Sequence, residues 1–493
     1  MLFNSFSFGL FLFCSYILYW AFFNRKIVLR NSFILAISYL FYGFWNAKLL
    51  LLIFAITTTD FCLGWLIDKE NKKEAFDSEG SEPVASKSSL RKYYLIAAIV
   101  ANLGALCFFK YFNFFADSFA KMVGFLTSSE VDSVALDIVL PVGISFYTFQ
   151  GLAYVLDVYK KKIEATRNVI DFYAFLSFFP QLIAGPIERA KDFLPQFQKV
   201  VTFDYEQARR GFFLIAVGLF KKVVIADRLA VYVDKVYADP SSVSGWPAVV
   251  AVLFFGFQLY LDFSAYSQIA IGTAKVFGFK LSQNFNMPYL ATSFKDFWAR
   301  WHITLTSWFR DYLYFSLGGN RKGVYRTMLN VIIVFSVSGL WHGASWNFVI
   351  WGFLNGLFMV LFDKVLKLAP TTLFHKIVSS LFVVGLWMLS LVFFRAETFS
   401  DALLMFQNLG LSNWEGMYLF GMDSRELKFT FVLLAGLMLI EALLKSRGEK
   451  IERLFFENYP PVRWAIYVSI VLASVYLGVY GNGSDNNFIY FQF

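Results

Sequence analysis

Residues 331–356 read VIIVFSVSGLWHGASWNFVIWGFLNG and contain no aspartate, glutamate, lysine or arginine. A helix that crosses a membrane needs about 20 predominantly apolar residues, so this stretch is long enough to lie mostly inside a bilayer. The whole chain agrees, because its 493 residues are 58% hydrophobic and only 16% charged. Soluble domains are about 25% charged. The composition therefore indicates a polytopic membrane protein and excludes soluble repeat arrays, disordered scaffolds, collagen and disulfide-rich secreted domains.

Apolar runs long enough to span a membrane recur along the entire chain. They lie at 6–23, 27–45, 49–67, 93–112, 138–158, 211–233, 247–273, 328–345, 346–366, 377–394, 429–445 and 463–481. Some could be half-spans or interfacial segments, and we expect about eleven true crossings. The sequence thus predicts an all-α integral membrane protein, with a single membrane domain over residues 1–493.

The loops between these runs alternate in charge. Loops 24–30, 68–92 and 159–168 are basic, whereas loop 113–137 contains a single basic residue, Lys121. Since cytoplasmic loops carry an excess of lysine and arginine, the N-terminus is expected outside the cytoplasm. The net charge of +9 then reflects topology and not a nucleic-acid-binding surface. The first run reads as a retained span, because no positive charge precedes it as in a signal peptide. The polar loop 68–92 is expected to be flexible.

Two further segments depart from a simple span or a short loop. Residues 169–187 read VIDFYAFLSFFPQLIAGPI, in which Pro180, Gln181 and Pro186 interrupt an apolar run. Freed backbone groups at membrane depth need protein partners, so we interpret this segment as a re-entrant element that starts and ends in the cytoplasm. A kinked ordinary span is the alternative. Residues 395–428 form a long outside loop, and we expect interfacial helices there.

The three cysteines, Cys14, Cys62 and Cys107, lie in separate apolar runs without a CxxC spacing. We expect them to be small buried hydrophobic residues and not disulfide partners or metal ligands.

An ionisable residue inside the membrane is a functional candidate by default. Asp262 lies in the apolar run FFGFQLYLDFSAYSQIAIG, with Gln258 one helical turn before it. Asp262 could contact a substrate or a pore, or it could be satisfied by structural hydrogen-bond donors.

His342 lies inside the stretch quoted first. Ser338 and Ser345 stand four residues before it and three after it, so in a helix they would share its face. Gly339 and Gly343 form a GxxxG pattern, which lets another backbone approach closely. Helix packing explains the glycines but leaves a desolvated imidazole unexplained, so we interpret His342 as a catalytic residue.

His302 lies in TSFKDFWARWHITLTSWFRDYLYFSLGGNRKG, residues 292–323, where aromatic residues recur at helical spacing. We expect an amphipathic helix at the cytoplasmic membrane interface, within a motif region over 284–327. On that helix His302 would lie beside Trp298 and Phe309. A histidine with only a structural role is the alternative.

Other catalytic patterns are absent, including GxSxG, the P-loop, HExxH and the dinucleotide-binding fingerprint. His375 lies in the basic loop 363–376 and is expected to be solvated. Two histidines without clustered cysteines or acids make a poor zinc site, so no metal is expected. Two buried imidazoles can instead act as general acid–base groups near neutral pH, taking a proton from a hydroxyl that attacks an activated carbonyl.

Several stretches match a known family in order along almost the whole chain. They are LPVGISFYTFQGLAYVLDVYK (140–160), FFPQLIAGPIERAKDFLPQF (178–197), YLDFSAYSQIAIG (260–272), NFNMPYLATSFKDFWARWHITLTSWFRDYLYFSLGGNRKG (284–323), SGLWHGASWNFVIWGFLNG (338–356) and FIYFQF (488–493). In these residues the sequence resembles the membrane-bound O-acyltransferase family. The closest resemblance is to its alginate O-acetylation branch, which includes peptidoglycan O-acetyltransferases. The two motif histidines show no departure from the family pattern.

The resemblance implies a helical bundle around a central funnel or tunnel, with re-entrant and interfacial helices. It implies that His342 is the catalytic base and that His302 helps to form the reaction chamber. It implies acetyl-CoA as a donor substrate on the cytoplasmic side of a bacterial inner membrane, with no bound cofactor. The acetyl group would cross the membrane, and a periplasmic SGNH-type esterase or transferase would move it onto a glycan. That glycan could be alginate, peptidoglycan, cellulose or another exopolysaccharide.

Other polar residues are weaker candidates for the same site. Those for the tunnel or substrate site are Asp262, Gln258, Ser338, Ser345, Trp341, Asn347, Arg310 and Asp311. Lys295, Arg300 and Arg321, near Lys322, could attract the phosphates of coenzyme A, although ordinary cytoplasmic-side charge explains them as well. Counting loops places His302 toward the cytoplasm and His342 near the far end of its span, so the two would mark a path through the membrane.

Two other classes of function stay open at this point. A transporter or flippase for a lipid-linked glycan would suit Asp262, Gln258 and the interrupted segment 169–187, although no internal repeat supports it. A structural subunit of a polysaccharide secretion complex is the other, and a buried His342 argues against it.

Overall fold

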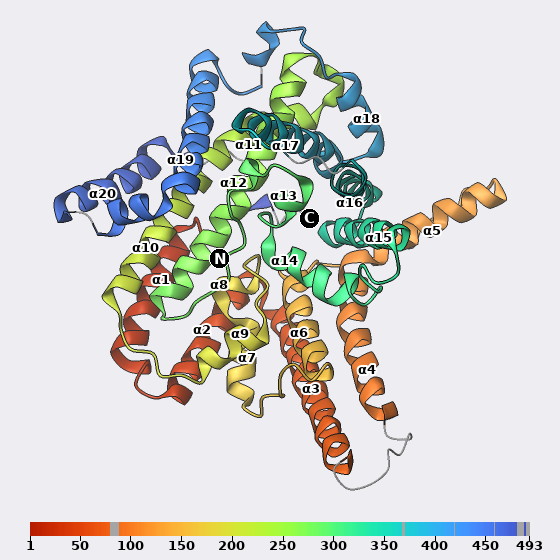
Figure 1. The fold of residues 1–493 in the computed structure, drawn as a ribbon, viewed down its shortest axis with the longest axis vertical. Coiled ribbons are helices and arrows are strands. Elements are labelled where there is room, and N and C mark those ends of the chain that lie inside the picture. Colours follow the sequence, from red (N-terminus) through yellow and green to blue (C-terminus); the bar gives the residue numbers. More distant parts are fainter. Residues whose placement is uncertain (79–87, 367–369, 419, 458, 481–487, 490–493) are drawn as a thin grey trace. The chain divides into compact units, whose positions relative to one another are not determined.

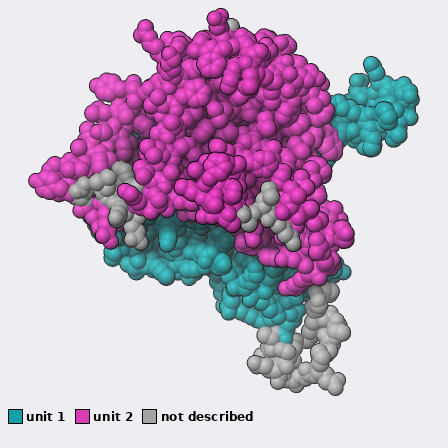
Figure 2. Space-filling model, turned by 45° about the horizontal axis from the view of Figure 1, so that its top comes forward, with its two compact units in different colours: residues 1–208, 274–282 teal, residues 209–273, 283–493 magenta. Residues whose placement is uncertain are grey.

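The computed structural model describes residues 1–78, 88–366, 370–418, 420–457, 459–480 and 488–489. All the named secondary-structure elements in these ranges are helices, which confirms the all-α prediction (Figure 1). The chain divides into two compact units, residues 1–208 with 274–282 and residues 209–273 with 283–493 (Figure 2). That residues 1–493 form one membrane domain stays a prediction.

The first unit contains mostly apolar helices from the N-terminal part of the chain. They are α1 (Phe6–Leu18), α2 (Ile27–Asn46), α3 (Leu50–Ser78), α4 (Ser88–Leu106), α5 (Phe112–Thr127), α6 (Ile144–Tyr159), α7 (Val169–Ser177), α8 (Phe179–Leu182) and α9 (Ala190–Phe197). A buried polar contact joins two of them, because Asn102 Nδ2 on α4 donates to Asp60 Oδ1 on α3 at 2.6 Å.

The interruption predicted within residues 169–187 is present. Helix α7 has nine residues and ends where Phe178 leaves the helical region at φ −51° and ψ 109°. Nine helical residues rise only about 13 Å, which is too short to cross a bilayer. The freed backbone groups find protein partners: Phe179 N donates to Ser38 Oγ at 3.1 Å, and Gln181 Nε2 donates to the Phe175 carbonyl at 3.0 Å. These contacts favour a re-entrant element over a kinked span, whereas the side on which it starts and ends stays a prediction.

The flexible loop predicted over 68–92 is wrong at both ends. Helix α3 continues to Ser78, and α4 begins at Ser88. The polar residues stay helical because they form ion pairs one turn apart, such as Lys72 with Asp68 at 2.9 Å. Residues 79–87 of the predicted loop lie outside the described residues.

The second unit contains the remaining α-helices, except for residues 205–208 of α10 and 274–276 of α12. They are α10 (Tyr205–Phe220), the π-helical turn η4 (Lys221–Ala226), α11 (Asp227–Ala238), α12 (Trp246–Val276), α13 (Phe294–Trp298), α14 (Ile303–Trp308), the π-helical turn η7 (Phe309–Tyr314), α15 (Val324–His342), α16 (Trp346–Phe358), α17 (Leu373–Arg395), α18 (Phe399–Gln407), α19 (Ser424–Phe456) and α20 (Pro460–Leu477). Helix α12 is buried over most of its apolar length, whereas none of the residues of α20 is buried. An apolar helix with an exposed surface of this kind suits contact with lipid.

Nine helical stretches of the described chain are long and apolar enough to cross a membrane. One of them, Ile27–Glu74, joins α2 to most of α3. The predicted spans at 138–158 and 211–233 are not among the nine. In the first, α6 begins only at Ile144 and has 16 residues. The nine stretches confirm a multi-pass membrane protein, and the expectation of about eleven crossings stays a prediction.

The prediction that the cysteines are buried is wrong. Cys14, Cys62 and Cys107 are free and exposed on the surfaces of their helices. Periodicity alone could not separate the inner face of such a helix from its outer face, because both faces are apolar.

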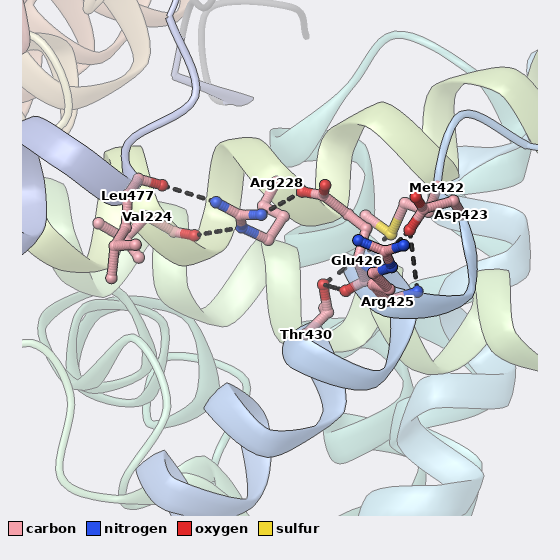
Figure 3. Close-up of polar contacts among 8 residues, drawn as sticks. All are labelled: Val224, Arg228, Met422, Asp423, Arg425, Glu426, Thr430 and Leu477. Carbon is pink, nitrogen blue, oxygen red and sulfur yellow. Dashed lines mark hydrogen bonds and ion pairs between the residues drawn. The ribbon is translucent and has the colours of Figure 1, made fainter.

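Arg228 ties three helical segments of the second unit together (Figure 3). Its guanidinium, on α11, pairs with the Glu426 carboxylate of α19 and donates to the Leu477 carbonyl at the end of α20 at 2.6 Å. The Asp423 side chain caps α19 by accepting from the backbone N–H groups of residues 425 and 426. The C-terminal helices are therefore attached to α11 by a charge-assisted contact.

Helices α15 and α16 form a close antiparallel pair, in agreement with the GxxxG prediction (Figure 1). A Cβ atom built at Gly339 would lie 2.1 Å from the Phe348 carbonyl oxygen and 3.1 Å from the Gly352 Cα. The two backbones approach this closely only because both positions lack side chains.

Replacing Gly339 with alanine is expected to separate α15 from α16 and to destabilise the protein by about 1–3 kcal/mol or more. The matched control is Gly385→Ala on α17, where a Cβ would meet nothing within 4 Å. Thermal unfolding of the two variants in detergent would measure the difference. Equal midpoints would contradict the close approach.

Candidate active site

The turn between α15 and α16 places His342. Helix α15 ends at His342, Gly343 follows in an extended conformation, and the Ser345 hydroxyl caps α16 by accepting from Asn347 N at 3.2 Å. Ser345 therefore does not share a helical face with His342, and that prediction is wrong because the helix ends first. The Asn347 amide donates to the Ala396 carbonyl at 3.1 Å, so both candidates build the turn that presents the histidine.

Aromatic rings surround His342, which is 6% exposed. The ring centroid of Trp341 lies 5.0 Å from that of His342, Trp351 lies 5.1 Å away and nearly perpendicular, and Phe394 lies 5.5 Å away. These rings bury most of the imidazole.

His302 lies in a turn and not within a helix. Helix α13 ends at Trp298, and His302 takes the left-handed conformation, with φ 41° and ψ 54°, just before α14 begins at Ile303. The continuous amphipathic helix predicted here is therefore wrong, and so is the placement of His302 beside Trp298 and Phe309. Its ring packs instead on Phe263 of α12, with centroids 4.7 Å apart.

The rings of the two histidines lie close together. Their ring centroids are 6.4 Å apart, and Trp341 lies 6.1 Å from His302. The placement of the two histidines toward opposite sides of the membrane is therefore wrong, whereas a path through the membrane at this point stays a prediction. His302 lies outside the nine candidate spans, and burial lowers the pKa of its imidazole to about 3. The His302 ring is thus neutral at ordinary pH.

Asp262 is held by partners within the protein. Its Oδ1 pairs with Lys222 Nζ of η4 at 2.6 Å, and its Oδ2 accepts from the Ile489 backbone N–H at 2.7 Å. Lys222 also pairs with Asp227 at 2.9 Å. Of the two readings of Asp262, the structural one is therefore supported. Gln258 is buried one turn away on the same helix.

Several of the remaining polar candidates are exposed or paired with a neighbouring residue. Arg310 is exposed and pairs with its neighbour Asp311 at 2.8 Å, while Arg321 is exposed on the turn before α15. Arg300 pairs with Asp296 at 2.7 Å.

The last two candidates are Lys295 and Ser338. Lys295 is exposed on α13, and Ser338 is partly exposed one turn before His342 on α15. The binding of coenzyme A phosphates by Lys295, Arg300 and Arg321 stays a prediction.

Sequence reasoning missed two polar residues that contact predicted site residues. Asn284 has no exposed surface, and its side-chain oxygen lies 3.1 Å from His302 Nδ1. Nothing in the local sequence marks Asn284, because the contact joins residues 18 positions apart. Lys222 did carry a signal, since a lysine within the predicted span 211–233 needs a partner at membrane depth.

Comparison with known proteins identifies the family. The family model for the membrane-bound O-acyltransferases matches residues 34–400. The chain belongs to the membrane-bound O-acyltransferase family. It is 39% identical over 382 residues to the probable alginate O-acetylase AlgI of Azotobacter vinelandii, covering 76% of this chain and 72% of that protein.

Two further relatives of this membrane-bound O-acyltransferase are similar over most of the chain. The probable alginate O-acetylase AlgI of Pseudomonas aeruginosa is 38% identical over 78% of this chain and 71% of its own length. The peptidoglycan O-acetyltransferase of Helicobacter pylori is 36% identical over 74% of this chain and 71% of its own length. The protein is therefore a membrane-embedded acyltransferase.

Proposed function

We propose that this acyltransferase takes an acetyl group from acetyl-CoA on the cytoplasmic side and passes it across the bacterial inner membrane to an extracytoplasmic glycan. The observation that carries the proposal is the pair of buried imidazoles, His302 and His342, whose rings lie 6.4 Å apart inside an aromatic wall. The relatives named for alginate and peptidoglycan acetylation support a polysaccharide acceptor. Cellulose and other exopolysaccharides stay possible acceptors.

The chemical step needs one base and no bound cofactor. An acceptor hydroxyl attacks the carbonyl carbon of the acetyl thioester, so a carbon–oxygen bond forms and the carbon–sulfur bond breaks. His342 takes the hydroxyl proton and returns it to the leaving coenzyme A thiolate. A neutral imidazole in a site closed to water suits this transfer, and the same wall limits hydrolysis of the thioester.

The family's central tunnel and a partner on the far side complete the proposal. Alternating basic loops support an N-terminus in the periplasm.

A periplasmic SGNH-type transferase would receive the acetyl group, and we propose that it docks on residues 395–428. In that segment α18 and the 3-10 turn Glu415–Tyr418 are present, and Leu411 and Trp414 are exposed. Photo-crosslinking from position 411 would test this, and crosslinks confined to other loops would contradict it.

The transporter alternative loses its main support, because Asp262 is engaged by Lys222 and by the Ile489 backbone.

The test uses purified protein in proteoliposomes with radiolabelled acetyl-CoA, with and without the periplasmic partner. Coenzyme A release and label transfer are followed in wild type, His342→Ala and His302→Ala, with His375→Ala as the exposed control. Release that depends on the two buried histidines supports the proposal. If wild type leaves acetyl-CoA intact even with the partner present, the donor is wrong or the chain is not the transferase.

A further inference from the structure

The turn that holds His302 is attached to a second segment by two backbone hydrogen bonds. Ile303 N donates to the Asn284 carbonyl at 2.9 Å, and Asn286 N donates to the Arg300 carbonyl at 2.9 Å. The contacts bracket His302 on both sides and hold it in the left-handed conformation. They also bring the buried Asn284 side chain against the imidazole.

The orientation of the Asn284 amide follows from its other partners. Its Oδ1 lies 3.3 Å from the Thr304 backbone nitrogen and 2.9 Å from the Thr304 hydroxyl. A backbone N–H can only donate, so the atom that faces it must be the amide oxygen. At the other end, Nδ2 lies 3.4 Å from the Ser267 hydroxyl of α12.

This orientation determines which nitrogen of His302 carries the proton. His302 Nδ1 lies 3.1 Å from the same Asn284 oxygen, which offers only lone pairs. For that contact to be a hydrogen bond, Nδ1 must be the donor. In a neutral ring the other nitrogen, Nε2, then holds a lone pair.

We propose that Asn284 is a positioning residue that holds His302 in the Nδ1–H tautomer, so that Nε2 accepts a hydrogen bond or a proton in the reaction chamber. His302 would then not donate a hydrogen bond to the thioester carbonyl. It would accept one from the His342 ring, which is the base that takes the hydroxyl proton. The tautomer is a property of the resting protein. Its consequence for acetyl transfer rests on the proposed function.

The test reads the tautomer directly. The chain has three histidines, so ¹⁵N-histidine labelling of the full-length protein in lipid nanodiscs, purified with a histidine-free tag, gives few imidazole signals. His342→Gln and His375→Gln assign two of them. We expect the remaining ring to show a protonated Nδ1 and a non-protonated Nε2 between pH 6 and 8. A protonated Nε2, in the other tautomer or in an imidazolium, would overturn the proposal.

Variants then separate positioning from packing. Asn284→Leu removes the acceptor and is expected to release the tautomer preference and to lower acetyl transfer at least tenfold. Asn284→Asp keeps an oxygen acceptor and should retain the Nδ1–H signal. Thr304→Val removes a competing donor from the same oxygen and should also retain it. A wild-type tautomer in folded Asn284→Leu contradicts the proposal. If the tautomer is as expected but His342→Ala and His302→Ala still transfer acetyl, only the proposed function fails.

Discussion

Replacing His342 with glutamine is expected to lower the rate of acetyl transfer by about 10²–10⁴-fold, the usual contribution of a general base. Glutamine is close to histidine in length and can form hydrogen bonds, but it cannot take a proton from an attacking hydroxyl. Because Trp351 and Phe394 close around the ring, the variant should still fold. Steady-state coenzyme A release and a thermal unfolding midpoint would be measured on the same preparation.

The control is His375→Gln, the same chemical change at an exposed position, and it should leave the rate unchanged.

The double variant His302→Gln/His342→Gln gives a sharper result. If the two rings act on one reacting group, the double variant should be little slower than His342→Gln alone, since residues that act as a unit are not additive. A rate that falls by the product of the two single effects would mean that the histidines act in separate steps.

Features of this protein that depend on neighbouring residues in the sequence could be predicted, whereas features that depend on contacts between distant residues could not. Runs of apolar residues predicted helices such as α12 and α15, because a span needs only length and composition. The α15–α16 pair was also predictable, since Gly339 and Gly343 mark a close approach within the local sequence.

The site itself was only partly predictable. The break at His302 was missed because no glycine or proline lies between Phe294 and Leu317 to signal a turn. That turn exists because Ile303 and Arg300 pair with residues near Asn284, and single-sequence periodicity carries no information on such pairing. The burial of His302 and His342 was predicted, but the distance between them depends on tertiary packing.

Replacing Lys222 with methionine is expected to destabilise the protein by about 3–5 kcal/mol, the usual cost of removing one partner from a buried ion pair. Lys222 is 2% exposed and pairs with both Asp262 and Asp227, at 2.6 and 2.9 Å. Methionine fills much of the same volume but leaves two buried carboxylates without their cation. Denaturant unfolding in a fixed detergent would measure the effect, with Lys428→Met on the exposed face of α19 as the matched control.

The acidic partner should be far more tolerant of change. In Asp262→Asn the amide oxygen can still accept from the Ile489 N–H, and Lys222 keeps Asp227, so the buried charges become one cation and one anion. We expect a loss well below that of Lys222→Met, with acetyl transfer retained, because both carboxylate oxygens of Asp262 are engaged by Lys222 and by the Ile489 backbone. A folded Asp262→Asn protein without transfer would return Asp262 to the substrate path. The Phe488–Ile489 segment lies against α12, where Phe488 packs on Tyr266 with ring centroids 5.0 Å apart. If both variants are equally unstable, the Asp262 carboxylate, and not Lys222, holds this segment in place.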